Sequence, residues 1–237
     1  MKKAIVIGAT SGLGREIALN LQRGGWAVGV AGRRVELLDG FDVYERIDVT
    51  SEYAVEGVER LVEKLGGVDL FVNVAGVGFQ NPTLDPIVEK HVFDVNGYGF
   101  MRMVDWAYNY FKCTNQPGHI AVISSIAGTK PLGTAAAYSA TKRMQSHYIT
   151  ALAQLARMEG LKIRFTDIRP GFAATDILNP NKHYPMMMSK EYAGRLATGA
   201  ILKKRRVAII DWKFAVLTFF WSLIPRCIWE RLTFVKN

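Results

Sequence analysis

The sequence of 237 residues contains little cysteine and no apolar run long enough to cross a membrane. Its two cysteines, Cys113 and Cys227, lie far apart without a CxxC pattern, which excludes a disulfide framework and predicts no metal site. The apolar run 214–225 covers twelve residues, whereas a membrane-spanning helix needs about 20. Gly8 and Gly12 interrupt the apolar N-terminal segment too early for an export signal. We therefore expect a protein of the reducing cytoplasm.

Acidic side chains are also in the minority, because 30 Lys and Arg stand against 21 Asp and Glu, for a net charge of +9. The excess lies mainly in residues 203–237, which hold eight Lys and Arg, two acids and three of the five tryptophans. Basic residues mixed with tryptophan favour a membrane surface or a partner subunit over a nucleic acid. No nucleic-acid partner is expected.

With 49% hydrophobic residues, the chain has enough apolar material for one sizeable core. Short β-branched runs alternate with longer amphipathic segments, as in repeated βαβ units. The sequence predicts a single α/β, Rossmann-like, doubly wound domain over residues 1–211, with helices on both faces of a seven-stranded parallel sheet. The expected strands are 3–8, 26–31, 42–47, 68–73, 118–124, 162–168 and 206–211, and the expected helices are 12–24, 51–65, 87–112, 135–158 and 190–202.

A glycine-rich turn follows the first expected strand and opens the first expected helix. Glycine at this place lets the backbone approach a pyrophosphate, whose charge the free amides and the helix dipole stabilise. The spacing is GxxxGxG and differs from the GxGxxG of the general dinucleotide fingerprint. A tight connection without a ligand is the alternative reading. The residues of the turn are Gly8, Thr10, Ser11, Gly12, Leu13 and Gly14.

Two arginines, Arg33 and Arg34, end the second expected strand, and no acid occurs there until Glu36. In a dinucleotide fold an acid at this place accepts from the ribose 2′-hydroxyl, whereas an arginine pairs with a 2′-phosphate. Together with Arg15 the pair can form a phosphate clamp through charge-assisted hydrogen bonds. We therefore expect NADP(H) in preference to NAD(H). The alternative is that the arginines only keep a loop soluble.

Tyr138 and Lys142 are four residues apart at the start of an expected helix, so their side chains share a face. An ammonium beside a phenol favours the phenolate, which brings proton transfer by the tyrosine nearer to neutral pH. Ser125 closes the preceding strand, at the edge where ligands of open α/β sheets bind. Tyr108 and Lys112 have the same spacing without such a serine, and we expect them to be surface residues of a helix.

The motifs of residues 3 to about 211, and the order in which they follow one another, resemble those of the classical short-chain dehydrogenase/reductase family. The family's catalytic set falls on Asn96, Ser125, Tyr138 and Lys142. The resemblance implies that Tyr138 is the general acid in carbonyl reduction and that Ser125 binds the substrate oxygen. It implies that Lys142 holds the nicotinamide ribose and lowers the tyrosine pKa, and that Asn96 supports a water chain that resupplies the proton.

The resemblance also implies the remaining cofactor contacts. The family's adenine-contacting Asp is matched by Asp48, and its Asn-Asn-Ala-Gly segment is matched with Val74 in place of the second Asn. The chain lacks the glycine-rich ending of acyl-carrier-protein ketoreductases, so that substrate class is not favoured. The expected cofactor-binding residues are Gly8, Thr10, Ser11, Gly12, Leu13, Gly14, Arg15, Arg33, Arg34, Asp48, Val49, Asn73, Ala75, Gly76, Tyr138, Lys142, Pro170, Gly171 and Thr175.

Two segments lie outside the regular pattern. Residues 173–190, with Pro180, Pro185 and three consecutive methionines, read either as a substrate lid or as plain packing. The apolar tail 212–237 reads either as an in-plane amphipathic helix that contacts the inner face of a membrane, or as a segment packed on its own domain or across a dimer. The resemblance implies a homo-oligomer, a dimer or a tetramer formed by the helices 87–112 and 135–158.

The leading functional hypothesis is an NADP(H)-dependent oxidoreductase that interconverts a carbonyl and an alcohol. The substrate is expected to be small or lipophilic, because Phe79, Phe172, Tyr184 and the methionines of the lid are suited to an apolar pocket. The alternative is a dinucleotide-binding regulator or scaffold without turnover. An epimerase or dehydratase of nucleotide sugars ranks last, because little chain is left for a separate substrate lobe.

Overall fold

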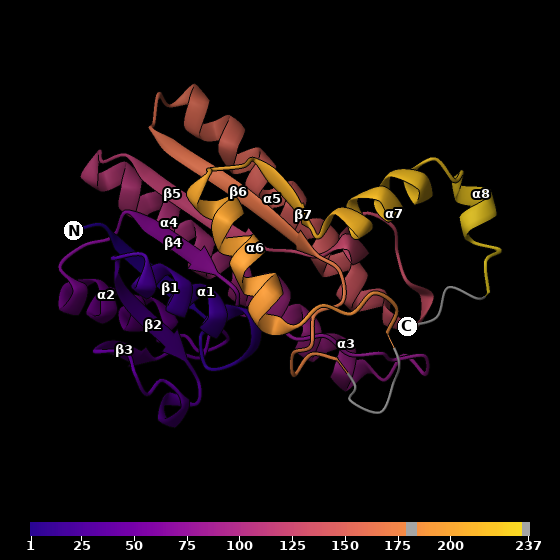
Figure 1. Ribbon diagram of the computed structural model, residues 1–237, viewed down its shortest axis with the longest axis horizontal. Helices are drawn as coiled ribbons and strands as arrows, with labels where there is room; N and C mark the ends of the chain where they lie inside the picture. Colours follow the sequence, from indigo (N-terminus) through magenta and orange to yellow (C-terminus); the bar gives the residue numbers. More distant parts are fainter. Residues whose placement is uncertain (179–183, 234–237) are drawn as a thin grey trace.

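A parallel sheet of seven strands runs through the centre of the molecule, as a computed structural model shows (Figure 1). The structure describes residues 1–178 and 184–233, so Pro180 of the predicted lid and the last four residues of the predicted tail lie outside the described residues. The strand order is β3-β2-β1-β4-β5-β6-β7, which confirms the predicted doubly wound sheet. The strands are β1 (Lys3–Ile7), β2 (Ala27–Gly32), β3 (Val43–Arg46), β4 (Leu70–Asn73), β5 (Gly118–Ile123), β6 (Ile163–Pro170) and β7 (Val207–Ile210).

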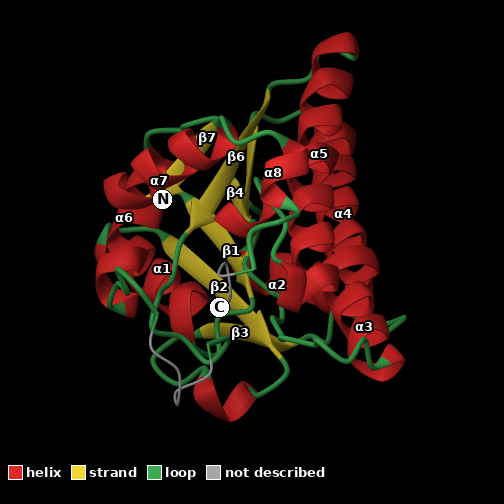
Figure 2. Ribbon diagram, turned by 90° about the vertical axis from the view of Figure 1, so that its right-hand side faces the viewer, coloured by secondary structure: helices red, strands yellow, loops and turns green. Residues whose placement is uncertain are grey.

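Helices cover both faces of this sheet (Figure 2). One core layer lies between the sheet and α1 and α6, and the other lies between the sheet and α2, α4 and α5. Successive residues of β1 alternate between the layers, with Val6 in the first and Ile5 and Ile7 in the second. The helices are α1 (Gly12–Arg23), α2 (Ala54–Leu65), α3 (Pro86–Phe93), α4 (Phe100–Thr114), α5 (Ala136–Met158), α6 (Lys190–Leu202), α7 (Trp212–Ser222) and α8 (Arg226–Trp229).

The segment expected as one helix over 87–112 is helical in three parts. A π-helical turn, Asp94–Gly99, separates α3 from α4. At Gly99 a Cβ atom would lie 2.8 Å from the Val49 side chain, so the wide turn lets the backbone press against the segment that follows β3. Single π turns inside helices are frequent at functional sites. This one carries Asn96.

The sheet reverses its winding between β1 and β4, which lie side by side and lead to connections on opposite faces. In open parallel sheets this switch point leaves a crevice beyond the carboxyl ends of the strands. The glycine turn after β1, the arginines after β2 and Ser125 after β5 all follow strand ends at this edge. The fold therefore brings these three predicted parts of the site to one edge of the sheet.

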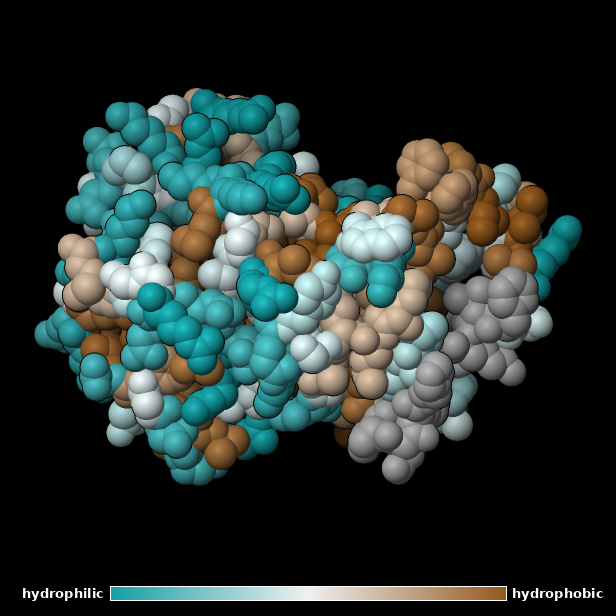
Figure 3. Space-filling model, viewed as in Figure 1, coloured by the Kyte–Doolittle hydropathy of each residue, from teal (hydrophilic) through white to brown (hydrophobic). Residues whose placement is uncertain are grey.

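The tail begins with α7 directly after β7 and projects beside the same edge of the sheet (Figure 1). Phe214 is completely buried, and the indole N–H groups of Trp221 and Trp229 donate to Thr129 Oγ1 at 3.0 Å and to the Pro131 carbonyl at 2.9 Å. One side of the tail therefore packs on its own domain. The space-filling view shows apolar surface on this projecting part of the molecule (Figure 3). Phe219 and Phe220 of α7 are each 61% exposed.

Candidate active site

A cavity of about 400 Å³ lies at the switch point, beyond the ends of β1, β2, β4 and β5. It joins the glycine turn to the Ser125, Tyr138 and Lys142 side chains in one continuous space. Of the residues predicted to act there, Arg15, Asn73 and Asn96 do not line the cavity. The predicted residues that do are Gly8, Thr10, Ser11, Gly12, Leu13, Gly14, Arg33, Arg34, Asp48, Val49, Ala75, Gly76, Ser125, Tyr138, Lys142, Pro170, Gly171 and Thr175.

The glycine turn is too tight for side chains. Gly8 has φ of +90°, and a Cβ atom there would lie 2.6 Å from Ala75 N. A Cβ atom on Gly14 would collide with the main-chain oxygen of Gly8. At Ser11, the N-cap of α1, the side chain makes no capping bond with any described residue, and the first turn of the helix carries no acid. The positive end of α1 is therefore open to the cavity, as the binding of a pyrophosphate requires.

The two arginines after β2 lie at the cavity, but Arg15 does not join them. Its guanidinium donates to the Leu37 carbonyl and, at 3.1 Å, to the Asp39 carboxylate, and it lies over the Phe41 ring. It therefore fastens the segment that follows β2. The Arg34 guanidinium donates to Ser11 Oγ at 3.3 Å and lies 3.6 Å from the Asp176 carboxylate.

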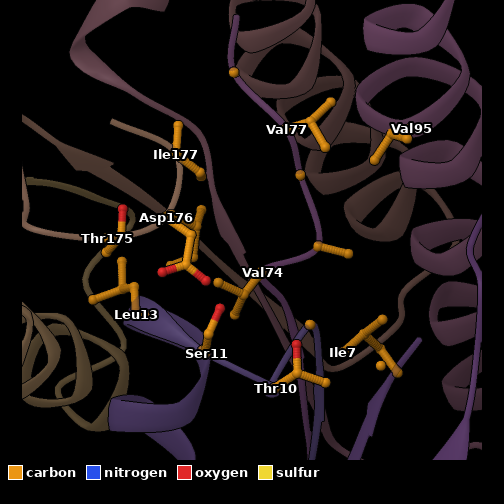
Figure 4. Close-up of a pocket in the computed structure, with 18 of the residues that line it drawn as sticks. Ile7, Thr10, Ser11, Leu13, Val74, Val77, Val95, Thr175, Asp176 and Ile177 are labelled. Carbon is orange, nitrogen blue, oxygen red and sulfur yellow. The ribbon is translucent and has the colours of Figure 1, made fainter. Parts of the chain in front are cut away.

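Asp176, which the sequence did not single out, lines the cavity beside the glycine turn, near Leu13 and Ser11 (Figure 4), and a Cβ atom on Gly12 would lie 3.0 Å from the side chain of the neighbouring Thr175. It belongs to the predicted lid, the start of which lines the cavity. Further along the lid, Met188 pairs with residues 172–174 through main-chain hydrogen bonds, so this end is fixed to the domain. The rings of two of the predicted substrate residues, Phe172 and Tyr184, contact each other at a tilt of 41°, with their centroids 5.1 Å apart. Phe79 is partly exposed and lines the cavity.

Two further predicted contacts are held by the loops around the sheet edge. Asp48 Oδ1 accepts hydrogen bonds from Thr50 N at 3.0 Å and from Thr50 Oγ1 at 2.7 Å. Burial raises the pKa of Asp48, but these bonds outweigh it and hold the pKa below its usual value. Asp48 is therefore a fixed carboxylate at the cavity. Asn73 is buried at the end of β4, and neither atom of its side-chain amide has a partner among the described residues.

Ser125 lies next to Tyr138 because the turn after β5 packs directly on α5. The Ser125 hydroxyl accepts a hydrogen bond from Ala127 N at 3.1 Å and starts the short helical turn Ile126–Gly128. A Cβ atom on Gly128 would lie 2.8 Å from the main-chain carbon of Lys142, so only glycine allows this approach. The Ser125 hydroxyl lies near enough to the Tyr138 phenol to lower its pKa.

Lys142 lies on the same face of α5 as Tyr138, with its Nζ 5.7 Å from the centroid of the tyrosine ring. Burial lowers the pKa of Lys142 to about 8, against the attraction of Asp167, so the ammonium form is retained at neutral pH. Burial raises the pKa of Tyr138, and its hydrogen bond with Ser125 partly offsets this. A buried phenol with an ammonium beside it can donate its proton, because the ammonium stabilises the phenolate that remains.

Asn96 lies behind the cavity wall and holds the loop that follows β4. Its side chain accepts from Val77 N at 2.8 Å and donates to the Val77 carbonyl at 2.7 Å. Its main-chain carbonyl accepts from the amide of Gln145 at 2.8 Å, and Gln145 accepts from Lys142 Nζ at 3.1 Å. The sequence reasoning did not single out Gln145, although its place three residues after Lys142 puts both on one face of the helix.

The second tyrosine and lysine pair has a structural role outside the cavity. Tyr108 is only 4% exposed, so the prediction of a surface position was wrong for this residue. Its hydroxyl donates to Glu159 at 2.8 Å, and Lys112 pairs with the same carboxylate at 2.6 Å. Burial and Glu159 raise the pKa of Tyr108, so it stays a neutral phenol.

Comparisons with known proteins agree with this geometry. The profile of the short chain dehydrogenase family matches residues 2–184. An uncharacterized oxidoreductase of Myxococcus xanthus is 30% identical over 97% of this chain and 95% of its own, and a farnesol dehydrogenase of Aedes aegypti is 32% identical over 75% and 79%. Among solved structures, an alcohol dehydrogenase of Thermococcus sibiricus complexed with 5-hydroxy-NADP superposes with a TM-score of 0.75 at 25% identity, covering 89% of this chain and 95% of that one.

Proposed function

The chain is an oxidoreductase of the short-chain dehydrogenase/reductase family, and from this membership we propose that it interconverts a carbonyl and an alcohol with NADP(H) as cofactor. The observation that carries the proposal is one cavity lined at one end by the glycine turn and at the other by Ser125, Tyr138 and Lys142. This supports the proposal, because a dinucleotide bound at the glycine turn would reach the proposed proton donor within the same cavity. The fold alone would not require this, because similar folds serve many functions.

The roles of the side chains follow from their contacts. When bound, NADPH supplies the hydride, and the protein supplies binding, orientation and the proton. The Ser125 hydroxyl holds the substrate oxygen, since it lines the same end of the cavity as the phenol of Tyr138. Tyr138 donates its proton to that oxygen during reduction and accepts it during oxidation. The ammonium of Lys142 stabilises the phenolate that remains after the donation.

The choice of NADP(H) rests on the charges at the end of β2. Arg33 and Arg34 both line the cavity, and no acid occupies this strand end. A 2′-phosphate at this place gains charge-assisted hydrogen bonds, whereas a 2′-hydroxyl would need an acceptor. The free N-terminus of α1 and the glycine cradle fit the pyrophosphate of either dinucleotide. The two arginines are therefore the support for NADP(H) over NAD(H).

We propose a lipophilic or small carbonyl as the substrate. Apolar residues line the cavity, among them Phe79, Val77 and Ile177. A Cβ atom on Gly78 would lie 2.7 Å from Ile177 Cγ2 and 3.2 Å from the Tyr138 ring, so this part of the lining is close to the phenol. The farnesol dehydrogenase among the relatives is named for a lipophilic alcohol. Such walls favour a ligand by burial of apolar surface, with the hydroxyls of Ser125 and Tyr138 orienting its oxygen.

The outer side of the tail supports a second, separate proposal on partners. No helix of the described part of the chain is long and apolar enough to cross a membrane. The exposed side of α7 carries large apolar residues and Lys213, and we propose that it contacts the cytoplasmic surface of a membrane. A homo-oligomer joined through this side is the alternative. Flotation with anionic vesicles against sedimentation of the protein alone separates the two.

Turnover with defined probes tests the proposed function. We expect the protein to oxidise NADPH with farnesal, or to reduce NADP⁺ with farnesol, followed by nicotinamide absorbance. Tyr138→Phe should abolish turnover and leave NADPH binding nearly unchanged. Tyr108→Phe is the matched control, because Tyr108 has the same spacing to a lysine but lies outside the cavity, and it should retain turnover. A fully active Tyr138→Phe variant contradicts the mechanism, and binding without turnover on any carbonyl favours the regulator or scaffold.

A further inference from the structure

Gln145 connects two members of the predicted catalytic set by direct hydrogen bonds. Its side chain is 1% exposed and lies between Lys142, one turn earlier on α5, and Asn96 on the π-helical turn. Lys142 Nζ donates to Gln145 Oε1 at 3.1 Å, and Gln145 Nε2 donates to the Asn96 carbonyl at 2.8 Å. A single side chain thus spans the space between the ammonium and this carbonyl.

The orientation of this amide is fixed by chemistry. An ammonium can only donate and a main-chain carbonyl can only accept, so one group between them must both accept and donate. The amide of Gln145 meets both requirements in one orientation and neither in the flipped one. The apolar side chains of similar length meet neither. Position 145 therefore requires a side chain that carries a hydrogen-bond acceptor and a hydrogen-bond donor side by side, as an amide does.

The resemblance implied that Asn96 supports a water chain that resupplies the proton, but here a side chain of the protein links the Asn96 carbonyl to Lys142. The Asn96 side chain is bonded to Val77, and its main-chain carbonyl is bonded to Gln145. Lys142 donates a second proton to the Ile123 carbonyl at 2.9 Å. With two of its three protons directed to Ile123 and Gln145, the ammonium has its third for the cavity that it lines.

We propose that Gln145 is a positioning residue of this site, whose amide holds the Lys142 ammonium in its charged form and joins it to the Asn96 carbonyl where the family resemblance implies water. The catalytic role of Gln145 rests on the proposed function. The bridge, meaning the two hydrogen bonds that Gln145 forms with Lys142 and the Asn96 carbonyl, does not depend on it. Gln145 acts through Lys142 and does not line the cavity. Because two protons of the Lys142 ammonium are bonded to Ile123 and Gln145, only the third, on the cavity side, is available for exchange with Tyr138.

The surroundings of Lys142 make its titration a direct readout of the bridge. The charged or titratable groups that face it are Tyr138 on its own helix and Asp167 on β6, which pairs with Arg169 at 2.7 Å. The π-helical turn and β5 present main-chain carbonyls to it. Asp94 of that turn pairs with Lys90 at the surface. A change at Gln145 therefore alters one neighbour of Lys142 and leaves the charged ones in place.

The first experiment measures the pKa of Lys142 by NMR titration of isotope-labelled lysine side chains, with the signal assigned by Lys142→Arg. The wild-type midpoint is expected at about 8. Gln145→Met removes the acceptor and should lower the midpoint by about one unit, whereas Gln145→Glu adds a negative charge and should raise it by a similar amount. Gln154→Met and Gln154→Glu are matched controls, because Gln154 is exposed on the same helix, and they should leave it unchanged.

The second experiment follows farnesal reduction by NADPH across pH for the same variants. Loss of rate at high pH should move to lower pH in Gln145→Met and to higher pH in Gln145→Glu, since a merely structural defect cannot shift it in opposite directions. If the Met variant does not fold, the direction of the Glu variant decides. Midpoints equal to wild type in the folded Gln145 variants overturn the inference. Shifted midpoints without turnover in the wild type refute the proposed function and leave the bridge intact.

Discussion

Replacing Arg33 by alanine should weaken NADPH binding far more than NADH binding. Among the described residues, Arg33 has no hydrogen-bond or ion-pair partner and only a longer-range attraction to Asp48, so it is free to bind a phosphate. A hydrogen bond to a charged group is worth about 1.5–3 kcal/mol, which corresponds to a rise in the dissociation constant of about 10- to 100-fold. NADH lacks the 2′-phosphate, and its dissociation constant should change by less than about threefold.

Arg34 needs a separate calculation because it already has a partner. Its side chain is 53% exposed and that of Asp176 is 69% exposed, so their ion pair at 3.6 Å contributes less than about 1 kcal/mol. A phosphate therefore displaces Asp176 with a net gain. Asp176→Asn releases Arg34 and removes a negative charge from the cavity, and it should tighten NADPH binding by up to about fivefold.

Calorimetric titration of both cofactors into wild type, Arg33→Ala and Asp176→Asn tests these magnitudes. Arg23→Ala is the control, since Arg23 is an exposed arginine at the far end of α1. Equal losses of NADPH and NADH affinity in Arg33→Ala would refute the phosphate clamp. Weaker NADPH binding in Asp176→Asn would show that the carboxylate orders Arg34 for the phosphate and does not compete with it.

Two further predictions concern the glycine turn and the buried histidine. Gly14→Ala should abolish binding of both cofactors in the calorimetric assay, because the added Cβ atom collides with the Gly8 carbonyl. Gly25→Ala is the control, because its Cβ atom meets no neighbour and the substitution strains only the backbone. Burial and Lys204 lower the pKa of His119 to about 4 from a usual value near 6.5, so the unfolded chain binds a proton that the folded one refuses. The free energy of unfolding should fall by up to about 3 kcal/mol as pH drops from about 6.5 to about 4. His119→Gln should flatten this slope in urea titrations, and an unchanged slope would show that other groups cause it.

The strands and most helices were predictable because each is a self-contained pattern of apolar residues. β5 is buried at all six positions, and its near-continuous apolar run indicates a strand covered on both faces. The division of 87–112 was not predictable, because the apolar periodicity of α3 and α4 continues across the π-helical turn. That turn depends on the close approach of Gly99 to Val49, a contact between distant parts of the chain.

The site shows the same limit. Gly8, Ser125 and Tyr138 line one cavity as the sequence predicts, because motif positions are tied to strand and helix ends, and the sheet topology brings those ends together. Arg15 was grouped with the arginines after β2 by charge alone, but its contacts with Leu37 and Asp39 depend on how the loop after β2 folds back. Asp176 escaped notice because a lone acid in an irregular segment has no pattern.

The tail shows both points, because its inner side packs against the turn after β6, which lines the cavity. α7 is apolar on every side, so periodicity could not show which residues face the domain. A Cβ atom on Gly171 would overlap the Phe214 ring, so the turn after β6 is shaped to receive this ring. Trp221 bonds the loop between Ser125 and Tyr138 through Thr129. Because α7 therefore touches a loop on each side of the cavity, the membrane contact proposed for its outer side would lie within one helix of the substrate.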